Sequence, residues 1–288
     1  MTASFRPQHR PFLVIAIVAV AALSAMLPSQ AATLLTEHFW RSTGNGGVTG
    51  LGWNAYRGST AVNLSAAAPS GATYEGAGWI NNNTVASAPD SNVAGSTAGY
   101  IYAQNRATAV TEGTPVTSGS TPPNYFIHTT TGISQEVSNF SSLSASWSQS
   151  TSANLNANTR LALRVDNVWY VALTPDNNTL SSTWQTLGTN ILAESWYRLD
   201  FTASSNMSVD TGTTYTSATF GNTISGIGFY VDALQTASTS VVANADFRTI
   251  RFDLLTLTGE AVPEPSRALL MFSALGLILL RRQRSFSL

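Results

Sequence analysis

Two short segments of the sequence combine arginine with tryptophan in a way that could bind a sugar. Arg164 and Trp169 flank a turn in RLALRVDNVWYVAL, and Trp196 and Arg198 alternate in SWYRLDF. An exposed indole ring can stack on a sugar ring, while a guanidinium group binds hydroxyl or acidic groups. These four residues are therefore the best candidates for a glycan-binding face. The alternative is that a loop or a second sheet covers them, since the aromatic residues of sandwiches are usually buried.

Residues suited to catalysis are few. The sequence contains no cysteine and three histidines, of which only His38 and His128 lie beyond the first 31 residues. Two histidines cannot complete a three-histidine zinc site. No Gly-x-Ser-x-Gly motif occurs, and GNGGVTG at residues 44–50 lacks the lysine of a phosphate-binding loop. The sequence thus favours a non-enzymatic protein. A carboxylate pair brought together by folding, as in a glycosidase or lyase, is the alternative.

Calcium is the metal for which the sequence offers ligands. Hard oxygen atoms lie in expected turns at Asp90, Asp166, Asp176, Asn177 and Asp210. Aspartate and asparagine in turns usually hydrogen-bond to the nearby backbone, and the sequence has no spaced Asp-x-Asp ladder. We therefore predict no cofactor and favour turn formation over calcium binding at these residues.

The charge of the chain argues against nucleic acid as a partner. Between Thr33 and Val262 the sequence has eight arginines, no lysine and 14 acidic residues, which gives a net charge of −6. Binding to phosphates requires clustered positive charge. Serine, threonine, asparagine and glycine replace charged residues over much of this span, a composition typical of exported β-rich proteins.

Alternating apolar and polar residues predict strands throughout residues 33–258. In RLALRVDNVWYVAL, Asp166 and Asn167 are expected to form a two-residue hairpin turn that pairs Val165 with Val168. Strands with one apolar and one polar face predict an all-β fold, an antiparallel β-sandwich over residues 32–259. The residues expected to face inward in four further strands are Leu143, Ala145 and Trp147; Tyr197, Leu199 and Phe201; Ile227, Phe229 and Val231; and Ile250, Phe252 and Leu254.

The N-terminus has the three parts of a secretory signal peptide. Residues 1–11 are positively charged without an acidic residue, residues 12–27 are apolar apart from one serine, and small residues follow. We predict a signal helix within residues 1–31, cleavage after Ala31 or Ala32, and export by the general secretion machinery. An uncleaved membrane anchor is the alternative.

The C-terminal segment, residues 260–288, differs in composition from the expected sandwich. Pro263, Glu264 and Pro265 precede residues 268–280, which are apolar apart from one serine and one glycine. A helix of this length spans about 20 Å, less than the ~30 Å core of a bilayer, although flanking arginines extend its reach. We predict a short transmembrane helix that holds the exported domain at the inner membrane. Its cytoplasmic end is marked by the basic cluster Arg281, Arg282 and Arg284.

The order Val-Pro-Glu-Pro, short apolar run and arginine-rich end resembles the PEP-CTERM sorting signal over about residues 260–284. The resemblance implies a Gram-negative bacterium that makes exopolysaccharide, and recognition by exosortase, a membrane enzyme with a cysteine nucleophile. Pro263, Glu264 and Pro265 would then form the processing motif. The protein would be anchored transiently and reach the cell surface or extracellular matrix, where exopolysaccharide is a further partner. A plain tail anchor is the alternative.

The strands between residues 140 and 258 carry a second resemblance. The pattern RLALRVDNVWYVAL, SWYRLDF, GIGFYVDAL and FRTIRFDLLTLTG resembles a concanavalin A-like or laminin G-like jelly roll. Such sandwiches often bind carbohydrate on a concave sheet, sometimes with calcium. Three functions follow as hypotheses: a non-enzymatic surface or matrix protein, a carbohydrate-binding module, and, third, a divergent polysaccharide hydrolase or lyase.

Overall fold

The structure is a computed structural model that describes residues 31–39, 48–62, 76–81, 99–106, 124–151, 158–176, 183–232 and 247–262. Contacts divide the chain into two compact units, Ala32–Gly259 and a unit made of residues 1–31 and 260–288. The predicted signal helix and the tail, from Pro263 through the arginine cluster, lie outside the described residues. Ala31 and Ala32 are described and exposed. No helix in the described ranges is long and apolar enough to cross a membrane.

One sheet of the unit Ala32–Gly259 has six strands in the order β11-β8-β15-β5-β4, with β1 also paired to β15. The pairing of β15 is antiparallel with β5 through its first half and with β1 through its second half. The strands are β1 (Ala32–Glu37), β4 (Gly76–Asn81), β5 (Gly99–Arg106), β8 (Phe140–Thr151), β11 (Gln185–Asn190) and β15 (Phe247–Ala261).

The other sheet has nine strands in the order β13-β12-β10-β9-β14-β6-β2-β3, with β7 also paired to β14. Two short 3-10 helices, η1 (Val48–Leu51) and η2 (Val137–Asn139), accompany the sheets. The strands are β2 (Asn54–Arg57), β3 (Thr60–Ala61), β6 (Tyr125–Thr129), β7 (Gln135–Glu136), β9 (Asn158–Val165), β10 (Val168–Ala172), β12 (Ser195–Thr202), β13 (Asn206–Thr216) and β14 (Thr223–Asp232).

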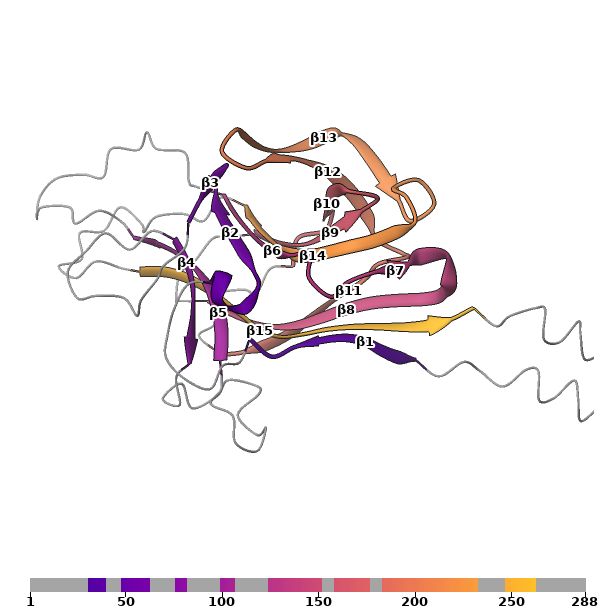
Figure 1. Cartoon of the computed structure of the whole chain (residues 1–288), viewed down its shortest axis with the longest axis horizontal. Coiled ribbons are helices and arrows are strands. Elements are labelled where there is room, and N and C mark those ends of the chain that lie inside the picture. The colour runs from indigo at the N-terminus through magenta and orange to yellow at the C-terminus, as the bar shows by residue number, and fades with distance from the viewer. Residues whose placement is uncertain are drawn as a thin grey trace, which may run out of the picture. The chain divides into compact units, whose positions relative to one another are not determined.

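The main core lies between the two sheets, which Figure 1 shows as layers with β8 and β15 below β14 and β6. Phe229 of β14 stacks on Phe252 of β15 at 4.2 Å between ring centroids, and Trp147 of β8 meets Phe229 edge-on at 5.5 Å. The inward-facing residues predicted for β8 and β14 all belong to this core. The predicted antiparallel β-sandwich is therefore confirmed.

The hairpin between β9 and β10 forms as the sequence predicts. Asp166 and Asn167 have φ angles of 46° and 69°, in the left-handed region that their short polar side chains tolerate. Val165 pairs with Val168 on either side of this turn. The hairpin carries Asn167 and Trp169, which line the site described below.

The prediction for the second half of β15 is wrong by one residue. Ile250 and Phe252 are in the main core as expected, but Leu254 is not, and Leu255 and Leu257 take its place. The cause is a local irregularity, because Leu254 has a φ of 48° and its N–H donates to the Asp253 carboxylate at 2.7 Å. An extra residue in a strand reverses which face the later side chains occupy.

Candidate functional site

The structure separates the four residues of the predicted glycan-binding face. Arg164 lies directly opposite Trp169, and paired residues share a face of the sheet. Trp196 and Arg198 belong to the other face, because β12 places Leu199 opposite Trp169. The prediction of one shared face is therefore wrong. Alternation defines the two faces of each strand, but only the register with the neighbouring strand decides which face joins which.

Trp196 belongs to the main core rather than to a binding face. It is fully buried and stacks on Phe220 at 5.8 Å between ring centroids. The prediction that Tyr197, Leu199 and Phe201 face the main core is consequently reversed. These three side chains lie on the opposite face of β12, whereas the side chain of Arg198 remains 50% exposed.

The face of the nine-stranded sheet that points away from the main core carries a hydrophobic cluster of its own, which we call the second cluster. Its buried residues come from β6, β9, β10, β12 and β14, and partly buried residues of β12 and β13 pack against them. The second cluster consists of Phe126, Ala162, Trp169, Val171, Leu199 and Tyr230, with Tyr197, Phe201, Met207 and Val209 packed against it.

The nine-stranded sheet curls around the second cluster. Five strand-to-strand steps separate β2 from β12, or about 24 Å in a flat sheet. The rings of Tyr56 and Phe201 are nevertheless 4.7 Å apart, and the N–H of Ser204 donates to the carbonyl of Ser59 at 2.7 Å. Figure 1 shows the end of the β12–β13 hairpin beside β3. The concave face of this sheet is thus filled by the protein's own side chains.

His128 lies within the second cluster and was not singled out by sequence reasoning. Its ring is 4.5 Å from that of Phe126 and 4.7 Å from that of Trp169, and the residue is 7% exposed. Neither ring nitrogen has a hydrogen-bond partner within the described part of the chain. Burial, and secondarily the charge of Arg164, lower the pKa of His128 to about 4. His128 is therefore neutral at ordinary pH.

Two glycines of β14 make room for these rings. A Cβ atom at Gly226 would lie 2.9 Å from the indole of Trp169, and one at Gly228 would lie 2.7 Å from Cβ of His128. Both distances are shorter than real contacts of a Cβ atom. The sequence SGIGF thus provides space for Trp169 and His128 against β14.

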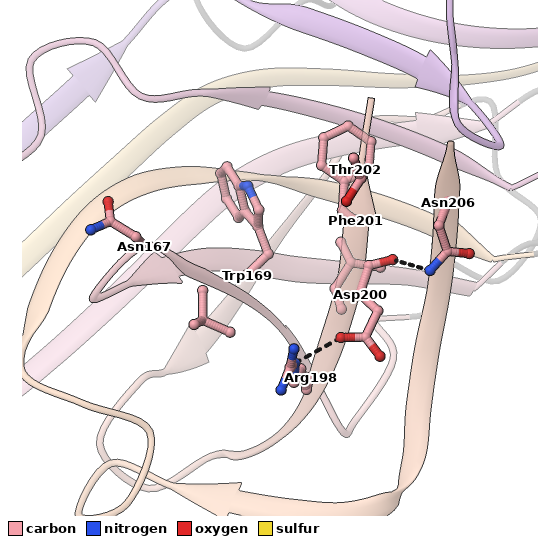
Figure 2. Close-up of a pocket in the computed structure, with 9 residues that line it drawn as sticks. Asn167, Trp169, Arg198, Asp200, Phe201, Thr202 and Asn206 are labelled. Carbon is pink, nitrogen blue, oxygen red and sulfur yellow. Dashed lines mark hydrogen bonds and ion pairs between the residues drawn. The ribbon is translucent and has the colours of Figure 1, made fainter. Parts of the chain in front are cut away.

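A small pocket of about 180 Å³ opens at the edge of the second cluster, where β12 continues beyond the last β10–β12 pair, Trp169 with Leu199. Figure 2 shows the Trp169 ring directed away from the Arg198–Asp200 ion pair, on the opposite face of the sheet. The apolar residues that line it are Val168, Trp169, Leu199 and Phe201. The polar ones are Asn167, Arg198, Asp200, Thr202 and Asn206.

An ion pair forms the polar side of the pocket. Nε of Arg198 lies 2.7 Å from Oδ1 of Asp200, and the two side chains are 50% and 40% exposed. The side-chain amide of Asn206 donates to the backbone carbonyl of Asp200 at 3.1 Å and holds the start of β13 against β12 (Figure 2). The pocket thus presents hydrogen-bond donors and acceptors at the edge of the second cluster.

Asp166 stands next to the pocket and anchors the turn that borders it. Its carboxylate accepts hydrogen bonds from the N–H groups of Asn222 at 2.9 Å and Thr223 at 3.0 Å. These two N–H groups lower the pKa of Asp166, so the carboxylate is ionised at neutral pH. These hydrogen bonds hold the turn between β9 and β10 against the start of β14.

The residues considered as calcium ligands are either engaged in turns or apart from one another. The carboxylate of Asp210 accepts the N–H of Gly212 at 2.9 Å, as that of Asp166 does for its own partners. Burial raises the pKa of Asp176 to about 6, with Glu194 adding to the effect. Asp90 and Asn177 lie outside the described residues. Within the described ranges, no three histidine or acidic side chains gather to hold a metal.

Comparison with known proteins does not show a family for this chain. No protein-family model matches the chain, and no curated protein matches it. The CBM22-1 xylan-binding domain of Xyn10C from Paenibacillus barcinonensis covers 82% of this chain and 100% of its own, at 10% identity and a TM-score of 0.34. The mannan-recognising carbohydrate-binding module TmCBM27 covers 81% and 100%, at 10% identity and a TM-score of 0.33. TM-scores this low establish no common function.

Proposed function

We propose that the protein is an exported, non-catalytic protein whose sandwich binds glycan at the pocket beside the Asp166–Asn167 turn, and whose C-terminal segment is a sorting signal. The observation that carries the glycan-binding part is the half-exposed Arg198–Asp200 ion pair, which lines a pocket together with Asn167 and Asn206. We also propose that the sandwich is of the jelly-roll type.

The chemistry of the pocket suits a sugar. A sugar ring has apolar C–H faces that pack on aromatic rings, and hydroxyl groups that both donate and accept hydrogen bonds. Trp169 and Phe201 supply the aromatic edge, and Asn167 supplies an amide. The ion pair supplies guanidinium donors and carboxylate acceptors side by side. Of the originally predicted residues, Trp169 and Arg198 therefore keep a place in the proposed site.

The proposal excludes catalysis because the pocket lacks a pair of carboxylates. Glycoside hydrolysis requires two, one acting as an acid and the other as a base or nucleophile. Among the described residues that line the pocket, Asp200 is the one carboxylate, and its partner is Arg198.

The export and sorting part of the proposal is supported by the sequence of the two ends. Ala32 is the first residue of β1 and pairs with Gly259 of β15, so cleavage after Ala31 would leave β1 whole. We propose transit through the inner membrane of a Gram-negative bacterium and anchoring by residues 268–280. Exosortase would then act at Pro263, Glu264 and Pro265, and the sandwich would associate with exopolysaccharide.

A binding experiment with two arginine variants tests the glycan-binding part. The full chain is titrated with neutral and acidic oligosaccharides, and Arg198→Ala is compared with Arg251→Ala, whose guanidinium lies over Tyr100 in the six-stranded sheet. We expect Arg198→Ala alone to lose binding. Absence of binding to every glycan, or equal loss in both variants, would contradict the proposal. Trp169→Ala is unsuitable, because truncating a buried tryptophan costs about 3–5 kcal/mol of stability.

A further inference from the structure

We infer that the pocket selects a neutral sugar residue and excludes uronates and other acidic sugars. The inference rests on the proposed glycan-binding function and specifies its substrate class. Arg198 is the one cation among the described residues that line the pocket. Its Nε is already bound to Asp200 at 2.7 Å, so its positive charge is neutralised where a ligand would meet it.

Two carboxylates lie next to Arg198 and make its surroundings acidic. Asp200 forms the ion pair with it, and Asp210 lies directly opposite Arg198 on β13. One guanidinium is thus set against two carboxylates. An anionic ligand would approach this net negative charge at short range, and juxtaposed like charges weaken binding.

A neutral sugar meets no such repulsion and matches the groups that are present. The guanidinium nitrogens of Arg198 donate hydrogen bonds, and the second oxygen of Asp200 accepts them. Neighbouring hydroxyls of one sugar ring can satisfy both groups at once, without either charge losing its partner. The two side chains are about half exposed and so are accessible to a ligand from solvent.

The size of the pocket limits how much of the glycan it can hold. Its volume of about 180 Å³ is below the roughly 300–1,000 Å³ of sites for drug-sized ligands. Trp169 closes one side and the concave face behind it is filled by the second cluster. The pocket therefore takes a single sugar residue, and affinity should change little with the length of the oligosaccharide.

A charge-removal variant tests the inference. The full chain is titrated calorimetrically at low salt with neutral oligosaccharides and with oligouronates of equal length. The wild-type chain should bind only neutral ligands. Asp200→Asn frees Arg198 from its partner and should raise affinity for oligouronates by about tenfold or more. Asp232→Asn, at the far end of β14, makes the same change in net charge and should leave both affinities unchanged.

The outcomes separate the inference from the function on which it rests. Preferential binding of oligouronates by the wild-type chain would overturn the neutral selectivity and leave glycan binding standing. Unchanged preference in Asp200→Asn, or an equal gain in Asp232→Asn, would show that the ion pair does not set selectivity. Binding to neither class of probe would overturn the proposed function itself.

Discussion

The ring of Phe126 on β6 lies 5.1 Å from the ring of Phe201 on β12, although three strands separate these two in the sheet. In a flat sheet the two strands would be about 19 Å apart. The contact is therefore direct evidence that the nine-stranded sheet closes over its own concave face. The proposed glycan site therefore lies at the edge of this closure.

The closure should depend on the glycines of β14. A Cβ atom at position 228 would lie 2.4 Å from the carbonyl oxygen of Ile127 and 2.7 Å from Cβ of His128. We expect Gly228→Ala to lower the free energy of unfolding by about 1–3 kcal/mol, because overpacking forces the backbone to move. Chemical denaturation measures the change. Gly212→Ala is the control, since its added Cβ would meet only the Asp210 side chain, at 3.2 Å.

Acid should weaken the fold through His128. Its pKa is about 4 in the folded protein and 6.5 in the reference state, so the unfolded chain binds the proton first as pH falls. The contribution of His128 to stability is unaffected above about pH 6.5, and it should fall by about 3 kcal/mol as pH drops to 4.

His128→Phe keeps an aromatic ring and removes the proton site. Unfolding free energies measured from pH 7 to pH 4 should decline more steeply for the wild type than for this variant. The comparison also cancels the opposite effect of Asp176, whose raised pKa of about 6 adds stability as pH falls below that value. Parallel curves for the two proteins would show that His128 is already solvated or paired in the folded state.

The anchoring of the β9–β10 turn predicts a third effect. Asp166→Asn keeps a residue that tolerates the positive φ but removes the charge that binds the N–H groups of Asn222 and Thr223. We expect a lower thermal midpoint at pH 7, by less than Gly228→Ala produces. Since the pKa of Asp166 is lowered on folding, the difference from wild type should vanish as pH falls through that lowered pKa. A midpoint equal to that of wild type at pH 7 would show that the carboxylate contributes nothing.

The sequence predicts local features well and long-range closure poorly. The hairpin at Asp166–Asn167 and the inward face of β8 follow from turn chemistry and from a period of two. The faces of β12 were assigned in reverse, because both faces carry large apolar side chains and only its register with β10 distinguishes them. In β15, no turn residue signals the irregularity at Leu254.

The candidate site likewise combines residues that the sequence predicts with relationships that only the structure shows. Trp169 and Arg198 could be chosen from the sequence because their side chains suit a sugar. Alternation places Asp200 on the same face as Arg198, but the ion pair between them and the pocket beside it are seen only in the structure. His128 alternates with Phe126 in YFIHT, which signals a shared face, yet nothing in that segment shows that β12 closes over it.

Processing of the tail is the last prediction, and it separates sorting from simple anchoring. The pairing of β1 with β15 ends at Gly259, and Val262 is 44% exposed, so removal of the residues beyond would break no described strand pair. Intact mass and terminal peptide mapping of the protein from its host should show a new C-terminus near Pro263–Pro265, absent from a strain without exosortase. Glu264→Gln should reduce processing, whereas Glu260→Gln, the same change outside the motif, should not. An unprocessed Leu288 in both strains would make the tail a plain anchor and leave glycan binding by the sandwich as the function to test.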